Sequence, residues 1–231
     1  HSYIVYAPLV AGATTVFREG AIDHPNPGVF YEIIEKYGVN VMFTAPTLLR
    51  MLMRYGEEYA QKYDLRSLRF LTCAGEPLNP EALKWTYEFI CGNGEWGHIV
   101  DNWWQTETGG PCLGTPATLP VRPGRVGVAM PGASLDIVDR EGQPITEPDK
   151  GGFLVITKPF PHFYRTVFGD PERYAKDWNT IPGVYLTGDV ALRDDDGYYM
   201  VVGRADDVLN VAGHRIGSAE VESALVSHPA V

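Results

Sequence analysis

The alternation of helical and strand-like segments over the first hundred residues constrains the fold of this chain most strongly. Three helical patterns, bounded by Pro or Gly, cover residues 26–38, 45–56 and 79–92. Three short apolar runs, typical of buried strands, cover residues 39–44, 68–75 and 97–103. This alternation predicts an α/β fold with a doubly wound, mainly parallel sheet.

From about residue 111 the pattern changes to short β-type runs separated by Pro and Gly, such as "GGFLVITK", "GDVALRD" and "GYYMVVGR". "RDDDG", residues 193–197, has the composition of a hairpin turn between the last two runs. These features predict an antiparallel, β-barrel-like subdomain.

The end of the chain returns to a helical pattern in "HRIGSAEVESALVSHP". Ser218 is the expected N-cap, and Val221, Ala224 and Leu225 are expected to face inward. We therefore expect three parts. Residues 1–110 belong to an α/β subdomain, residues 111–206 form a β-rich subdomain, and residues 207–231 begin a small α+β domain.

Composition excludes some classes of function. The formal net charge is −10, and no dense block of Lys and Arg appears, which argues against nucleic-acid and membrane-surface partners. The longest apolar runs are too short and interrupted to span a bilayer. Cys73, Cys91 and Cys112 show no metal-binding spacing and are expected to be reduced thiols in the cytoplasm.

Two polar stretches follow predicted strands, where ligands bind in open α/β sheets. "AGEPLNPEA", residues 74–82, leads into a helix N-terminus, and Gly75 permits close approach of a ligand to the backbone. By itself this stretch is more often ordinary turn chemistry. "DNWWQTETGG", residues 101–110, is harder to explain as a solvated loop, because two tryptophans stand among groups that bind phosphate and metal.

Thr106 offers a hydroxyl to a phosphate oxygen, and Glu107 offers a hard oxygen ligand to Mg²⁺. Further along, Asp189 could accept two hydrogen bonds from a ribose diol, and Arg204 and Arg215 could pair with phosphate oxygens. Each of these three is alone more often a turn or surface residue. Together the groups predict a nucleotide site beside an apolar pocket, in an enzyme that handles phosphate with Mg²⁺.

At these residues the chain resembles the adenylate-forming (AMP-binding) superfamily, most closely its AMP-forming acetyl-CoA synthetases. "AGEP", "DNWWQTETGG", "YLTGD", "GRADDVLNVAGHRIG" and "AEVESAL" carry the resemblance, which extends over essentially all 231 residues. It implies a ligase that activates a short-chain carboxylate, acetate or propionate, to an acyl-adenylate with ATP and Mg²⁺. Coenzyme A then forms the thioester and releases AMP, so the implied partners are small molecules only.

The resemblance also implies roles for single residues. The nucleotide site would be lined by Gly75, Glu76, Pro77, Asp101, Asn102, Trp103, Gln105 and Thr106. Thr106 would lie near the α-phosphate, Glu107 would hold Mg²⁺ and Arg215 would contact the phosphates, so these three act in the reaction. Asp189 would bind the ribose hydroxyls, with Arg204 close to the same sugar.

Trp104 would close the acyl pocket and leave room for about two to three carbons, because the neighbouring walls are packed at native density. Ala74 stands where many acetate enzymes carry Val, which widens the pocket and makes propionate a serious substrate. Asp206 matches a hinge, and Ala212 and Gly213 match the segment that contacts coenzyme A. A structural cation of related enzymes matches Val226, His228 and Val231.

The match also has gaps. The family's Gly/Ser/Thr-rich phosphate loop would precede His1, and its adenylation lysine would follow Val231. We therefore expect this chain to be the central portion of the enzyme and inactive by itself. Asp23, where relatives often have Asn, and Ala212, where Ser is common, leave the coenzyme A contacts less well specified.

Two other functions fit the same residues. One is adenylation for a different acceptor, such as a carrier-protein thiol. The other is a nucleotide-binding or oligomerisation module without catalysis.

Overall fold

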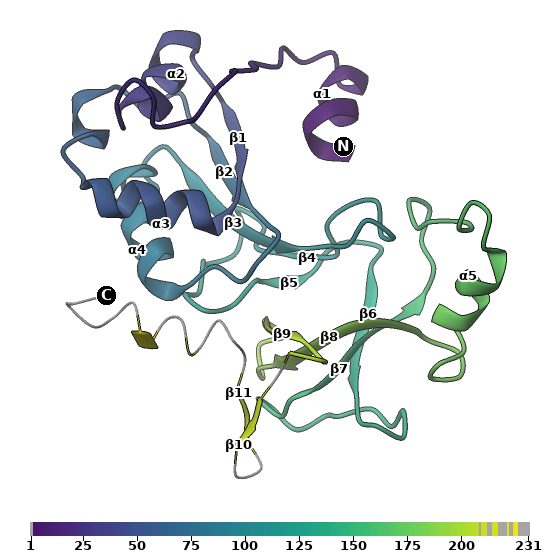
Figure 1. Cartoon of the computed structure of the whole chain (residues 1–231). Helices are drawn as coiled ribbons and strands as arrows, with labels where there is room; N and C mark the ends of the chain where they lie inside the picture. The colour runs from purple at the N-terminus through teal and green to yellow at the C-terminus, as the bar shows by residue number, and fades with distance from the viewer. Residues whose placement is uncertain (1, 208, 212–213, 217–220, 222–223, 226–231) are drawn as a thin grey trace. The chain divides into compact units, whose positions relative to one another are not determined.

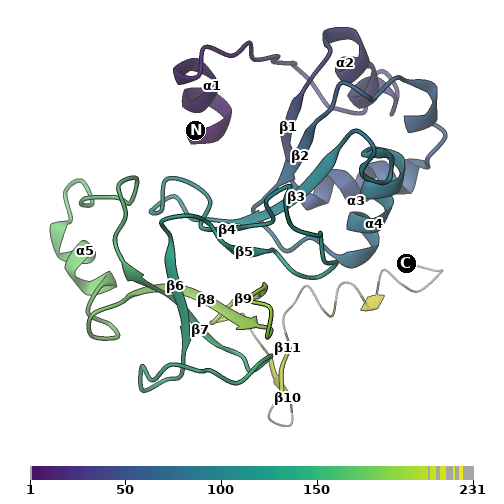
Figure 2. The same cartoon turned by 180° about the vertical axis from the view of Figure 1, so that it is seen from behind.

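The computed structural model describes residues 2–207, 209–211, 214–216, 221, 224 and 225. The chain divides into two compact units. The first comprises His1–Asp101 and Ala117–Pro123, and the second comprises Asn102–Pro116 and Gly124–Val231. Figures 1 and 2 show both units, which are described separately below. The functional division into residues 1–110, 111–206 and 207–231 remains a prediction.

The first unit is built on the parallel strands β1 (Val41–Thr44), β2 (Phe70–Cys73) and β3 (His98–Trp103). Helix α3 (Pro46–Tyr55) connects β1 to β2, and α4 (Pro80–Phe89) connects β2 to β3. The two helices lie against each other, on the same side of the strands in both views (Figures 1 and 2). This confirms the predicted α/β fold with parallel strands.

Short helical segments complete the first unit: Ser2–Tyr6, α1 (Ala7–Val10), α2 (Val29–Tyr37), Ala60–Lys62 and Gly92–Gly94. Helix α2 ends where Gly38 adopts a left-handed conformation with φ 57°, which favours glycine. Val29, Phe30 and Ile34 are buried on its inner face. Tyr37 lies in the last turn, next to Lys36, and is 56% exposed.

The second unit is built on an antiparallel sheet of β6 (Ser134–Val138), β7 (Gly152–Lys158), β8 (Tyr185–Arg193) and β9 (Tyr199–Arg204), in that order. Two short strands, β4 (Leu113–Gly114) and β5 (Val128–Ala129), pair with each other, and β4 also pairs with the end of β3. The predicted antiparallel β-rich part is confirmed. Within the described residues its main sheet is open rather than closed into a barrel.

The hairpin between β8 and β9 turns at the predicted "RDDDG" stretch. The Asp194 carboxylate accepts hydrogen bonds from the backbone N–H groups of Asp196 and Tyr198, at 3.1 and 2.8 Å. Gly197 has a φ of +84°, which a residue with a side chain adopts only with strain. The turn aligns β8 with β9 and thereby places Asp189 opposite Arg204.

Helix α5 (Pro171–Asp177) was not expected from the sequence. Asp170 caps it by accepting a hydrogen bond from the Arg173 backbone N–H at 3.2 Å, and Pro171 occupies the first helical position. The helix packs through Tyr174 on a buried aromatic cluster that includes Phe163 and Tyr185. The stretch "DPER", residues 170–173, therefore has the composition of a helix start, although the segments around it have strand patterns.

After β9 the chain forms a small hairpin of β10 (Leu209–Val211) and β11 (His214–Ile216). Val221, Ala224 and Leu225 are helical but exposed, Val221 by 40% and Leu225 by 56%, so the expectation that they face inward is wrong. An apolar stripe identifies the face of a helix suited to burial, but it does not supply the surface to bury it. The expected N-cap, Ser218, lies outside the described residues.

Candidate functional site

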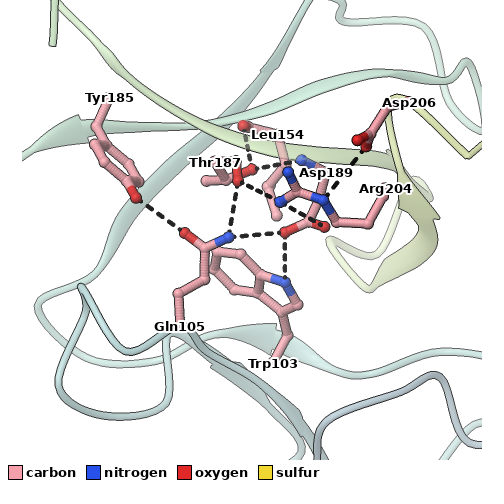
Figure 3. Close-up of polar contacts among 8 residues, drawn as sticks. All are labelled: Trp103, Gln105, Leu154, Tyr185, Thr187, Asp189, Arg204 and Asp206. Atoms are coloured by element: carbon pink, nitrogen blue, oxygen red, sulfur yellow. Dashed lines mark hydrogen bonds and ion pairs between the residues drawn. The ribbon is translucent and has the colours of Figure 1, made fainter. Parts of the chain in front are cut away.

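A buried carboxylate, that of Asp189 on β8, lies at the centre of the polar contacts in Figure 3. The residue is only 7% exposed. Its Oδ2 accepts one hydrogen bond from the indole Nε1 of Trp103 and one from Nε2 of Gln105, both at 3.1 Å. Two residues of the "DNWWQTETGG" stretch are thus joined to the "YLTGD" stretch, as a shared site requires.

Arg204 balances this charge from the neighbouring strand. Antiparallel pairing of β8 with β9 places Arg204 opposite Asp189, with its Nη1 3.9 Å from Asp189 Oδ1. The same Nη1 donates to the backbone carbonyl of Thr187 at 3.2 Å, and Nε lies 3.5 Å from Asp206 Oδ1. The side chain of Arg204 is 52% exposed, so its guanidinium can also reach a ligand.

Burial raises the pKa of Asp189, whereas hydrogen bonds from Trp103 and Gln105 and the charge of Arg204 oppose that rise; the net shift is upward. A carboxylate has about four acceptor positions, and the donors in Figure 3 occupy two on one oxygen. The group can therefore accept hydrogen bonds from a ligand that carries adjacent hydroxyls.

The backbone beside Asp189 is closely packed. Gly188 has a φ of +78°, and a Cβ atom there would stand 2.7 Å from Nη1 of Arg204. The Thr187 hydroxyl donates to the Leu154 carbonyl at 2.7 Å and accepts from the Asp189 N–H at 3.1 Å. In the order Thr-Gly-Asp, the threonine thus supplies hydrogen bonds to the backbone, and the positive φ at the second position favours glycine.

The loop after β3 is held in shape by residues distant in sequence. The Tyr185 hydroxyl donates to Oε1 of Gln105 at 3.2 Å. The Tyr164 N–H donates to the Glu107 carbonyl at 2.8 Å, and His162 Nδ1 lies 2.5 Å from the Thr108 carbonyl oxygen. At Gly109, with φ +67°, a Cβ atom would stand 2.4 Å from the His162 carbonyl oxygen.

Thr106 is exposed on this loop, and the Glu107 side chain is 29% exposed. Nη2 of Arg173, on α5, lies 3.6 Å from Oε1 of Glu107. No cluster of three or more His, Cys, Asp or Glu suited to a metal occurs in the described part of the chain. Mg²⁺ commonly binds one or two carboxylates together with substrate phosphates, so Glu107 fits this ion as a single protein ligand.

The "AGEP" loop lies in the first unit. Ala74 is buried, and Gly75 has a φ of +104° with no described atom within 4 Å of the position of a Cβ. The Glu76 carboxylate is bound by two side chains of α3: Nη2 of Arg50 lies 3.0 Å from Oε1, and the Thr47 hydroxyl donates to the same oxygen. The space beside Gly75 allows a ligand to approach the backbone closely.

The other predicted residues are placed less completely. Asp101 ends the parallel pairing with β2, and Asn102 is 6% exposed with its Oδ1 lacking a hydrogen-bond partner among the described residues. Trp104 is half-buried. Arg215 lies in β11, without a described side chain. Five predicted residues lie outside the described residues: Ala212, Gly213, Val226, His228 and Val231.

All three cysteines are free and buried. Burial raises the pKa of the Cys91 thiol to about 12 and that of Cys112 to about 11, and it raises the pKa of Cys73 well above its usual range. A thiol must ionise to act as a nucleophile. These cysteines are therefore buried core residues with free thiols.

Sequence reasoning missed the residues that support the loop: His162, Tyr164, Arg173 and Tyr185. Arg173 followed a readable local signal, the "DPER" helix start, and Tyr185 begins the "YLTGD" motif without its role being indicated. The others act through contacts across the unit, as between Tyr185 and Gln105, which are 80 positions apart.

The family model for AMP-binding enzymes matches residues 1–162. The chain belongs to this family. Among the AMP-binding enzymes it resembles, the acetyl-coenzyme A synthetase of Deinococcus radiodurans is 52% identical over all of this chain, which covers 35% of that protein. That of Methanothrix thermoacetophila is 50% identical, with the same coverage. The chain thus spans about a third of the length of these relatives.

A solved structure supports the same assignment. The anthranilate CoA ligase AuaEII, crystallised with anthranoyl-AMP, matches 97% of this chain with a TM-score of 0.80 and 27% identity, and the chain covers 40% of it. None of the helices in the described part of this AMP-binding chain combines the length and apolar character needed to cross a bilayer.

Proposed function

We propose that the protein containing this chain activates a short-chain carboxylate, acetate or propionate, and transfers the acyl group to coenzyme A. A carboxylate oxygen attacks the α-phosphorus of ATP, and the bond to pyrophosphate breaks, which leaves an acyl-adenylate. The coenzyme A thiolate then attacks the acyl carbon, and AMP leaves. Relatives about 50% identical are named acetyl-coenzyme A synthetases, and the structural neighbour holds an acyl-adenylate.

The observation that carries this proposal is the buried Asp189 carboxylate with Arg204 beside it. Burial of a carboxylate costs stability, and here two hydrogen bonds and the charge of Arg204 offset only part of that cost, which is expected of a group kept for binding. Asp189 accepts from the ribose hydroxyls, and Arg204 lies close to the same sugar. The Trp103 indole, tied to Asp189, forms part of the nucleotide wall.

The reacting phosphates are handled by the loop after β3 and by Arg215. Thr106 donates a hydrogen bond to the α-phosphate, and Arg215 pairs with phosphate charge. Bringing two anions together is the main barrier, so positioning and charge neutralisation supply most of the rate enhancement. Gly75, Glu76, Pro77, Asp101, Asn102 and Gln105 line the rest of the nucleotide site.

Glu107 is the residue that would hold Mg²⁺. The ion neutralises phosphate charge when bound. The exposed edge of the Glu107 carboxylate suits this role, since an ion bound also to ATP needs few protein ligands.

The acid is selected by Trp104 and Ala74. A tryptophan side chain fills the volume that a longer acyl chain needs, whereas the small Ala74 leaves space for one further carbon. Asp206 is the proposed hinge for the later step, in which Ala212 and Gly213 contact coenzyme A. Val226, His228 and Val231 remain the proposed structural cation site. We also propose a cytoplasmic location, which the three free, buried thiols support.

Carboxylate-dependent exchange of pyrophosphate into ATP by the full-length protein tests the proposal. Exchange with acetate or propionate that falls sharply at butyrate is the expected result. Nucleotide binding without exchange for any of the three acids would show that this protein does not activate short-chain acids.

A further inference from the structure

The carboxylate of Glu76 is bound by two side chains of α3. Thr47 and Arg50 lie on the first turns of α3, and both bind the same carboxylate oxygen, Oε1. Nη2 of Arg50 also donates to the Thr47 hydroxyl at 3.3 Å, so the three side chains form one closed set. This set of Thr47, Arg50 and Glu76 is called the loop clamp below.

The parallel register explains why these residues meet. Thr44, the last residue of β1, pairs with Cys73, the last residue of β2. Thr47 and Glu76 stand at equivalent positions beyond that pair, at the edge of the sheet where ligands bind in open α/β folds. The clamp therefore joins two consecutive strand–helix connections at the functional edge of the first unit.

The N-terminus of α3 has a specific need for the carboxylate. Its N-cap residue is Ala45, which has no side-chain acceptor, so the first backbone N–H groups of the helix lack a local cap. Glu76 supplies negative charge there from the neighbouring loop, where its carboxylate accepts a hydrogen bond from the Thr47 hydroxyl. Burial raises the pKa of Glu76, but hydrogen bonds from Thr47 and Arg50 outweigh it, and the net pKa lies below its usual value.

The loop clamp also leaves the backbone at Gly75 accessible to a ligand. With its Glu76 side chain bound to α3, the loop retains open space in front of Gly75, where φ is +104°. Glycine has the widest range of backbone conformations, so an anchor on the residue after Gly75 limits the conformations that the loop can adopt. The side chains of Arg50 and Glu76 are only 28% and 34% exposed, which limits screening of the pair by solvent.

We propose that Arg50 is a positioning residue, which holds the nucleotide-contacting backbone of Ala74–Leu78 in place through Glu76. This inference rests on the proposed nucleotide function. It assigns the Glu76 carboxylate to the loop clamp and leaves the backbone at Gly75 to contact the nucleotide.

The test uses Arg50→Met, Glu76→Gln and the double variant, with Arg54→Met as the matched control. Arg54 lies one turn further along α3 and is exposed. Hydrogen exchange of the Ala74 amide, which donates to the Thr44 carbonyl at 3.3 Å at the start of the loop, is measured on the full-length protein. We expect about tenfold faster exchange in Arg50→Met, as for loss of a charged hydrogen bond, and no change in Arg54→Met. Arg50→Lys should restore part of the protection.

In the full-length protein, the KM for ATP in pyrophosphate exchange should rise about tenfold in Arg50→Met, while kcat changes less than about twofold. The double variant should be no worse than the poorer single variant, because both remove the same interaction. Additive losses, or an Arg50→Met variant indistinguishable from Arg54→Met, would overturn the inference. Absence of acid-dependent pyrophosphate exchange in the wild-type protein would refute the proposed function. The hydrogen-exchange measurement would still test the loop clamp in that case.

Discussion

At the scale of single residues, burial of the Asp189 carboxylate costs stability, and its proposed role is to bind the ribose. We expect Asp189→Asn to weaken adenine-nucleotide binding by the full-length protein about 10- to 100-fold, because a hydrogen bond to a charged acceptor contributes about 1.5–3 kcal/mol. Isothermal titration with AMP measures this. Asp195→Asn, an exposed acidic residue at the tip of the β8–β9 hairpin, is the matched control. Equal affinities for the two variants would remove Asp189 from the site.

The same substitution predicts a pH dependence of folding. The pKa of Asp189 is raised in the folded state, so the contribution of this residue to stability is greatest below its unfolded pKa. That contribution falls as the pH rises through the folded pKa. We therefore expect the stability of Asp189→Asn relative to wild type to increase between about pH 4 and pH 7. Urea unfolding measures it; a constant difference would contradict the prediction.

Trp104 is the residue on which acid selection is predicted to depend. Trp104→Gly should raise the butyrate-to-acetate ratio of kcat/KM at least about tenfold, since one methylene in a filled pocket changes discrimination by that order. Trp104→Phe, which keeps an aromatic wall, should change the ratio much less. Unchanged chain-length selectivity in the glycine variant would show that Trp104 lies outside the acyl pocket.

At the scale of secondary-structure elements, helix α5 supports the loop that carries Glu107. Asp170→Ala removes the side-chain cap of α5 and should lower its stability by about 1 kcal/mol. Faster amide exchange across Arg173–Asp177 is the expected observation. Asp170→Asn keeps the acceptor and should behave like wild type; equal effects of the two substitutions would show that capping by this side chain is unimportant.

At the scale of the whole protein, the segment after β9 is the predicted hinge. Asp206 is 75% exposed and follows the last residue pairs of the β8–β9 hairpin. Asp206→Pro restricts the backbone there. It should leave pyrophosphate exchange unchanged and slow thioester formation about 100-fold, because misplaced reacting groups lower a rate by about that factor. Quenched assays of the adenylation and thioester-forming half-reactions measure the two rates. Equal losses in the two steps would contradict a hinge at this position.

The sequence alone determined the local features of this protein, because their signals lie within a few residues. The parallel strands β1–β3, the helices that connect them, and the β8–β9 turn followed from Pro, Gly and apolar periodicity. The family followed from short motifs, because their residues and their order along the chain can be recognised without a structure. Helix α5 was missed because it is only about two turns long and lies between segments with strand patterns.

Only the tertiary structure decided which partners these residues have. Trp103 and Asp189 are 86 positions apart, and no local pattern indicates that the indole N–H donates to that carboxylate. Likewise, the sequence predicts that Glu76 lines the nucleotide site, but only strand register shows that its carboxylate binds Thr47 and Arg50. Burial, charge compensation and side-chain direction depend on residues from several elements at once, so they arise only when the register and packing of those elements are established.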